Sequence, residues 1–267
     1  LASMGIAVLR FDFTGLGHSE GEFANTNFSS NVEDLVLAAK YLETQGKAPA
    51  LLIGHSLGGA AVLKAASQIE TIKAVVTIGA PACPSHVVHN FGSSLDEIKN
   101  HGKANVCLAG RQFTINQSFV DDVMLENLEP AIVNLKKALL VLHSPTDAIV
   151  GIENAATIFQ AAKHPKSFVT LDDADHLLSD ADDAEYAAEV ISAWAIRYLG
   201  IMTPARPIGV PEGVVRSTEA EPEKYLQDVT AGPLHHILAD EPATYGGTDK
   251  GMTPYQMLSA ALASCTS

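Results

Sequence analysis

Residues 50–61 of this 267-residue chain read ALLIGHSLGGAA, a short apolar run that leads straight into a glycine-rich turn. Gly54, Ser56 and Gly58 in this stretch match the pattern G-x-S-x-G. In a nucleophile elbow with that pattern, a strand enters a sharp turn, the serine lies at its tip, and a helix leaves at once. Small neighbours let strand and helix approach each other. The stretch therefore predicts a strand, a strained serine and a helix, in that order.

The same pattern occurs a second time, around Ser19 in GHSEG. Five residues, DFTGL, separate this turn from the nearest apolar run, and a turn-rich loop, EFANTNFSS, follows it. The glycines near Ser19 therefore favour tight turns, and we predict that Ser56 is the nucleophile. Gly15 and Gly17 do not form a dinucleotide-binding fingerprint either, because Glu20 stands where that fingerprint needs a third glycine.

Short apolar runs alternate with amphipathic segments along the first 200 residues. Such alternation is typical of an α/β fold, in which helices cover both faces of a parallel sheet. Ser30 and Glu33 have the spacing of a capping box for the first helix, and Gly46 follows its last apolar residue. The expected strands are 5–11, 50–54, 72–79, 138–143 and 167–171, and the expected helices are about 30–45, 57–68, 152–164 and 183–199.

Two stretches of the sequence do not follow this alternation of apolar and amphipathic segments. Residues 81–137 predict a cap insertion at the carboxyl edge of the sheet, with a hairpin near NVCLAGRQFTI and a helical piece near residues 120–137. Residues 201–213 belong to a stretch rich in proline and glycine and predict a linker. The expected domains are therefore 1–200, with the insertion, and a second unit over 214–267.

A nucleophilic serine needs a base and an acid that orients the base, and in this type of sheet they follow in the order Ser, Asp or Glu, His. Asp147 comes just after the strand at 138–143, and His176 just after the strand at 167–171. Because the carboxyl ends of parallel strands share one edge, we predict that Ser56, Asp147 and His176 meet there. Asp173 and Asp175 are alternative acids, less favoured because they lie so near His176 in the chain.

With these motifs, residues 1 to about 200 resemble an α/β hydrolase that lacks its first strands; FDFTGLGHSEG, LLIGHSLGGAAVL, LLVLHSPTDAIVGIENA and LDDADHLLSD carry the resemblance. It implies attack by Ser56 on an acyl carbonyl of a small ester or thioester, with His176 as general base and no cofactor. It also implies one oxyanion donor at the backbone N–H of Leu57 and a second in a loop before residue 1. We accordingly expect residues 1–267 alone to be poorly soluble or partly unfolded, and nearly inactive on p-nitrophenyl acetate.

Residues 214–267 end in a segment where Thr253, Pro254 and Gln256 predict a capped helix, with Cys265 on its apolar face. Free cysteine often simply packs as a small hydrophobe. The unit also resembles the beginning of an OsmC-type domain, an α+β fold whose helix-borne cysteine reduces peroxides with a second cysteine absent from this chain. That resemblance implies a homodimer formed through this domain. An alternative function follows from it, in which the hydrolase fold is a non-catalytic binding module for a hydroperoxide reductase.

Charge and cysteine usage exclude other classes of function. The chain has 17 Lys and Arg against 31 Asp and Glu, a formal net charge of -14, so nucleic acid and anionic membranes are not expected partners. Cys83, Cys107 and Cys265 are odd in number and widely spaced, which favours reduced thiols and a cytoplasmic location. Cys83, His86 and His89 have a spacing that could suit a metal, but Pro84 and the lack of a fourth ligand argue against a site.

Overall fold

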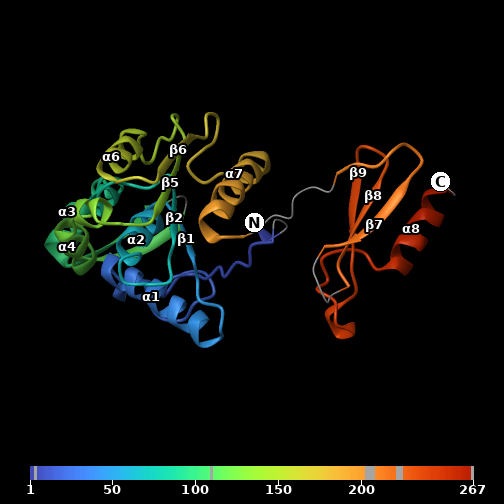
Figure 1. Cartoon of the computed structure of the whole chain (residues 1–267). Coiled ribbons are helices and arrows are strands. Elements are labelled where there is room, and N and C mark those ends of the chain that lie inside the picture. Colours follow the sequence, from blue (N-terminus) through green and yellow to red (C-terminus); the bar gives the residue numbers. More distant parts are fainter. Residues whose placement is uncertain (3–4, 109–110, 202–207, 221–224, 266–267) are drawn as a thin grey trace. The chain divides into compact units, whose positions relative to one another are not determined.

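The computed structural model describes residues 1–2, 5–108, 111–201, 208–220 and 225–265. The chain divides into two compact units, Leu1–Ile201 and Met202–Ser267 (Figure 1). Among the described residues, the first unit contains a parallel sheet with helices, and the second contains an antiparallel sheet and one α-helix. Within the described ranges, none of the helices combines the length and the apolar character that crossing a membrane requires.

Four parallel strands form the central sheet of the first unit in the order β1-β2-β5-β6. All six residues of β5 are buried, as are four of the five in β2, as expected for strands covered on both faces. The strands predicted at these places are confirmed. Their bounds are Leu51–His55 for β1, Ala74–Ile78 for β2, Ala138–His143 for β5 and Lys166–Thr170 for β6.

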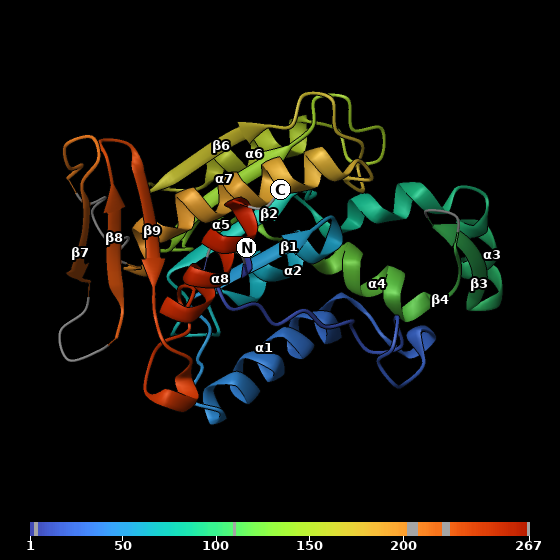
Figure 2. The same cartoon turned by 90° about the vertical axis from the view of Figure 1, so that its right-hand side faces the viewer.

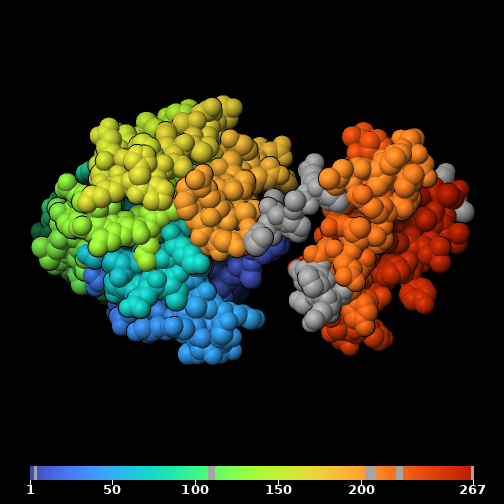
Figure 3. All heavy atoms as spheres, viewed as in Figure 1, coloured from blue at the N-terminus to red at the C-terminus, as the bar shows by residue number. Residues whose placement is uncertain are grey.

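Helices cover both faces of this sheet, because successive residues of a strand point to opposite sides. Leu139 and Val141 of β5 join a core with α1, α2 and α6, whereas Leu140 and Leu142 join a second core with α7. Figure 1 shows α2 and α7 on opposite sides of the sheet, and Figure 2 shows α7 crossing the face of the strands. In Figure 3 the segments of α6 and α7 form much of the visible surface of this unit. The helices are α1 Phe28–Thr44, α2 Leu57–Ala65, α6 Glu153–Ala161 and α7 Ala181–Leu199.

Residues 81–137 lie between β2 and β5 and hold their own small elements. The predicted hairpin is present as two antiparallel strands paired from Lys103 and Asn116 to Leu108 and Arg111. The predicted helical piece is two helices, because Glu126 has an extended backbone with ψ of 131° that ends the first of them. The elements are the 3-10 helix η3 Pro84–Phe91, α3 Ser94–His101, β3 Lys103–Leu108, β4 Arg111–Asn116, α4 Gln117–Leu125 and α5 Glu129–Val133.

Residues 5–11 were expected to form a strand, and that prediction is wrong. The segment joins no ladder of the sheet, whose edge is β1, and Val8 and Leu9 are 54% and 47% exposed. Branched apolar residues favour a strand only where a neighbouring strand pairs with their backbone groups. Here the sequence pattern is present without that pairing.

The predicted cap of α1 is also wrong. Asn27, not Ser30, is the N-cap: its side chain accepts a hydrogen bond from the Ser30 N–H at 2.8 Å, and the Ser30 hydroxyl oxygen accepts one from the Asn27 N–H at 3.0 Å. The helix therefore begins at Phe28, ahead of the predicted start, which lets the Phe28 side chain become fully buried. A 3-10 turn, η2, covers Phe23–Asn25 just before it.

The second unit contains three antiparallel strands in the order β7-β8-β9, a 3-10 turn and α8. Part of the predicted linker, residues 202–207, lies outside the described residues. The predicted cap of α8 is confirmed, since the Thr253 N–H donates to the Gln256 side chain and the Gln256 N–H donates to the Thr253 hydroxyl. Cys265 is exposed, so its interpretation as a packed hydrophobe is wrong. The elements are β7 Val215–Glu219, β8 Gln227–Ala231, β9 His235–Ala239, η4 Ala243–Tyr245 and α8 Pro254–Cys265.

Candidate active site

Ser56 lies at the tip of a sharp turn between β1 and α2. Its backbone has φ 53° and ψ −129°, a conformation that costs a residue with a side chain about 1–3 kcal/mol and that surrounding structure must hold in place. Small residues make the turn feasible. A Cβ on Gly54 would lie 2.2 Å from the carbonyl oxygen of Gly58, and one on Gly59 would lie 2.5 Å from the Cβ of Ala80. The predicted strand, strained serine and helix are all present.

The structure brings the three predicted side chains together at the carboxyl edge of the sheet. His176 Nε2 is 3.0 Å from the Ser56 hydroxyl oxygen, and His176 Nδ1 is 2.7 Å from Asp147 Oδ2. Ser56 follows β1, Asp147 follows β5 and His176 follows β6. One line of hydrogen bonds therefore connects residues that are up to 120 positions apart in the sequence.

Asp147 is held in one orientation by its own loop. Its Oδ1 accepts hydrogen bonds from the backbone N–H groups of Ile149 and Val150, both at 2.9 Å. Burial raises the pKa of this carboxyl, but the hydrogen bonds from His176, Val150 and Ile149 outweigh burial and leave the pKa below its usual range. An ionised Asp147 only accepts, so His176 Nδ1 carries a proton and Nε2 is free to accept one from Ser56.

Leu57, the predicted oxyanion donor, is the first residue of α2. The first N–H groups of a helix have no partner within the helix, and the helix dipole places partial positive charge there. The Leu57 N–H therefore lies next to Ser56 in the part of the site best suited to a developing negative charge.

Sequence reasoning missed two residues that shape this site. Gly79 follows β2 with φ +54°, and a Cβ there would lie 3.3 Å from both Asp147 Oδ2 and His176 Nδ1. His143, the last residue of β5, is buried, and its Nε2 donates to the carbonyl oxygen of Val150 at 2.7 Å, which closes the loop that holds Asp147. The signal available for each was its position at a strand end, the same signal that singled out Asp147.

The residues that the sequence offered as another nucleophile or another acid do not contact the His176 ring. The Ser19 hydroxyl donates to the backbone oxygen of Asp12 at 2.6 Å, within a tight turn. Asp175 Oδ1 accepts from the Ser179 N–H at 2.7 Å, and Asp173 is exposed. Asp147 is therefore the carboxylate that contacts the His176 ring.

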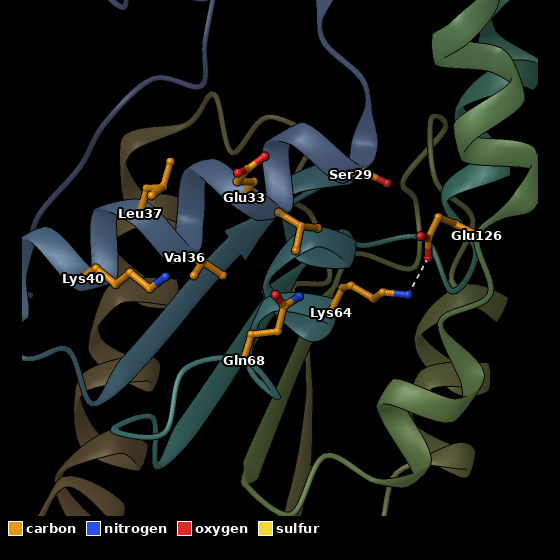
Figure 4. Close-up of a pocket in the computed structure, with 9 residues that line it drawn as sticks. Ser29, Glu33, Val36, Leu37, Lys40, Lys64, Gln68 and Glu126 are labelled. Carbon is orange, nitrogen blue, oxygen red and sulfur yellow. Dashed lines mark hydrogen bonds and ion pairs between the residues drawn. The ribbon is translucent and has the colours of Figure 1, made fainter.

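No group of three or more metal-ligating side chains is present among the residues that the structure describes. Cys83 Sγ lies 3.0 Å from the Ser85 hydroxyl and 3.7 Å from the Glu126 carbonyl oxygen, and the rings of His86 and His89 meet edge to face at 5.5 Å. A separate hollow lies along α1 and α2, where Lys64 pairs with Glu126 at 2.8 Å (Figure 4). Neither place includes Ser56, Asp147 or His176.

Comparison with known proteins gives the same picture of the first unit. The family described as "Serine aminopeptidase, S33" matches residues 1–106. The solved esterase domain of a Rhodothermus marinus protein is 53% identical to this chain and superposes with a TM-score of 0.62. The match includes 75% of this chain and 78% of that esterase domain.

Curated sequences give more distant matches. The mitochondrial palmitoyl-protein thioesterase ABHD10 of Rattus norvegicus is 25% identical over 189 residues, which are 68% of this chain and 62% of that protein. The uncharacterized protein YfhR of Escherichia coli O157:H7 is 20% identical over 189 residues. This chain spans 59% of the length of that protein and 60% of its Salmonella typhi counterpart.

Proposed function

The chain belongs to the α/β hydrolase family, and from that membership we propose that it hydrolyses a small carboxylic ester or thioester with Ser56 as nucleophile. The observation that supports this most directly is the line of hydrogen bonds from Ser56 through His176 to Asp147. A serine hydroxyl is a weak nucleophile unless a neighbouring base takes its proton. In this arrangement His176 Nε2 is that base.

In the first step, the Ser56 oxygen attacks the acyl carbonyl carbon while its proton passes to His176 Nε2. The imidazole becomes an imidazolium, whose positive charge the ionised Asp147 stabilises through Nδ1. The carbonyl oxygen becomes an oxyanion next to the N–H of Leu57, and one such donor typically contributes about a hundredfold to a thousandfold to turnover. The leaving alcohol or thiol then takes the proton from His176, and the acyl group stays on Ser56.

In the second step, a water molecule is the nucleophile in place of Ser56. His176 Nε2 takes a proton from the water as its oxygen attacks the acyl carbon, and the proton then returns to the Ser56 oxygen as the acid leaves. The same residues serve both steps because the geometry of His176, between Asp147 and Ser56, is unchanged.

The choice of substrate class rests on the relatives. One is named as an esterase domain and another as a palmitoyl-protein thioesterase, and both names describe cleavage of an acyl group from oxygen or sulfur. We propose that residues 81–137 act as the cap that shapes the acyl pocket, since they lie between β2 and β5.

The experiment is to measure hydrolysis of p-nitrophenyl acetate and of an acyl thioester by the natural full-length protein and by its Ser56→Ala variant. We expect turnover of at least one substrate and its loss in Ser56→Ala, because the Ser56 hydroxyl is the group that contacts His176 Nε2. Ser19→Ala is the matched control and should retain activity. The alternative of a non-catalytic binding module predicts no turnover with either substrate, and activity that survives in Ser56→Ala would contradict the assignment.

For the second unit, we propose that residues 214–267 belong to an OsmC-like domain in which Cys265 reduces hydroperoxides. The exposure of the thiol supports this, because a peroxide can reach it. The Cys265 thiolate would attack one oxygen of the O–O bond; the bond breaks, the other oxygen leaves as an alcohol after taking a proton, and the sulfur becomes a sulfenic acid. An external dithiol would supply the two electrons that restore the thiol.

This second activity is measured as consumption of cumene hydroperoxide with dithiothreitol, in the protein and in Cys265→Ser. We expect the variant to lose consumption and to keep ester hydrolysis. Equal rates of peroxide consumption in both proteins would remove Cys265 from the reaction. The homodimer expected from the resemblance is checked on the same samples by light scattering.

A further inference from the structure

His55, the residue before Ser56, contacts the loop that holds His176. Its Nε2 lies 2.6 Å from the backbone carbonyl oxygen of His176, across 121 positions of sequence. The two imidazole rings lie 4.9 Å apart at an angle of 47°. The side chain that neighbours the nucleophile in the chain therefore touches the proposed base in space.

The loop around His176 has few other bonds to the sheet. The Leu171 N–H donates to the carbonyl oxygen of His143 at the start of the loop. The bonds from Leu178 and Ser179 to Asp175 are local turn contacts, which shape the loop but do not fix it to the strands. The His55 contact is different because β1 supplies the donor.

The carbonyl partner of His55 determines which ring nitrogen of His55 is protonated. A carbonyl oxygen only accepts, so Nε2 of His55 carries the proton. Burial lowers the pKa of His55 and outweighs the opposing effects of the His176 carbonyl, Asp147 and Asp175, while the nearby His176 ring lowers it further. The ring is therefore neutral at neutral pH, which suits a neighbour that must itself become an imidazolium during the reaction.

We propose that His55 is a positioning residue whose Nε2–H fixes the His176 loop, so that His176 stays within hydrogen-bonding distance of both Ser56 and Asp147. This inference rests on the proposed role of His176 as base. Ser56 and His55 are consecutive residues at the end of β1, so one strand end would fix both the nucleophile and, through this bond, its base. Displacement of a catalytic group by about 1 Å can lower turnover by about a hundredfold.

The experiment compares His55→Phe with His55→Gln. Phenylalanine keeps a flat ring of similar size without the donor, whereas glutamine carries an N–H at the same distance along the side chain and does not titrate. We expect His55→Phe to lower kcat by about tenfold to a hundredfold with little change in KM, because the base and not the substrate is displaced. We expect His55→Gln to recover kcat to within a few fold. His101→Phe, on the exposed end of α3, is the control for adding a phenyl ring.

Rates are expressed per site titrated with a fluorophosphonate over a long incubation, so that a partly folded variant still gives a kcat. A wild-type kcat in His55→Phe would overturn the proposal. Equal losses in the phenylalanine and glutamine variants would also overturn it, because ring packing and not the donor would then be responsible. Turnover that survives in Ser56→Ala is a different result: it contradicts the proposed function itself.

Discussion

Gly79 lies directly against the ring of His176. A Cβ at this position would be 3.3 Å from His176 Nδ1 and equally close to Asp147 Oδ2, and the backbone has φ +54°. Both facts disfavour any side chain at this position. We predict that Gly79→Ala lowers kcat by about tenfold to a hundredfold, because the added methyl group displaces the His176–Asp147 pair. Steady-state hydrolysis of a p-nitrophenyl ester measures this.

The control for Gly79 is Gly46, which has φ +68° and no atom within 4 Å of an added Cβ. Both alanine variants should lose about 1–2 kcal/mol of stability from the left-handed backbone, measured by the fluorescence of the single tryptophan, Trp194, during unfolding. Only the Gly79 variant should lose turnover. Equal kcat values in the two variants would mean that Gly79 does not constrain the site.

Asp147→Asn tests the orientation of the base. An asparagine side chain can present its amide nitrogen to His176 Nδ1, which would favour the tautomer that cannot accept the proton of Ser56. We predict a fall in kcat of about a thousandfold or more, comparable with the known effect of this replacement in a serine protease. Circular dichroism should show that the variant is folded. A variant within tenfold of the wild-type kcat would remove Asp147 from the mechanism.

The same carboxylate should contribute to stability in a way that depends on pH. The pKa of Asp147 is lower in the folded protein than its ordinary value of 3.8. The stabilisation is therefore complete above that value and is lost as the pH falls through the lower, folded pKa. Denaturant unfolding between pH 7 and pH 2 should show a smaller loss of stability in Asp147→Asn than in the wild type. Parallel curves for the two proteins would contradict this.

Asp240 should play a comparable structural role in the second unit. It is buried and accepts hydrogen bonds from the N–H groups of Glu241, Thr248 and Lys250 and from the Thr248 hydroxyl. Burial raises its pKa, but these bonds outweigh burial and lower the pKa to about 2. The stabilisation is thus complete above the ordinary value of 3.8 and is lost as the pH falls towards about 2.

Asp240→Asn replaces an acceptor oxygen with a donor and leaves some of these N–H groups without a partner. We predict faster amide hydrogen exchange in residues 240–250 of the variant at pH 7, with exchange in the first unit unchanged. Mass spectrometry of the two proteins measures both regions in one experiment. Unchanged exchange over 240–250 would show that the Asp240 side chain does not hold this loop.

How much the sequence predicts depends on whether the relevant contacts are local. The strand, turn and helix around Ser56 are consecutive, so the apolar run before Gly54, the spacing of Gly54 and Gly58 and the small residues after them predict all three. Asp147 and His176 could be predicted because parallel strands bring their ends to one edge. The contact of His55 with His176 spans 121 positions, and no local pattern of residues indicates it.

The errors have a similar origin. A strand at 5–11 needs a partner strand, and the apolar pattern records only its side chains. For α1, both Asn27 and Ser30 are good N-cap residues, and the burial of Phe28 favours the earlier one. In each case a contact made outside the local window decides the outcome.

The central claim is that Ser56 is the nucleophile, activated by His176. The most direct measurement is labelling of the protein with a fluorophosphonate, followed by mass spectrometry of the modified peptide, with Ser56→Ala, His176→Ala and Ser19→Ala in parallel. We predict one adduct on Ser56 in the wild type and in Ser19→Ala, no adduct in Ser56→Ala, and much slower labelling in His176→Ala. An adduct that persists in Ser56→Ala, or labelling of His176→Ala at the wild-type rate, would contradict the account.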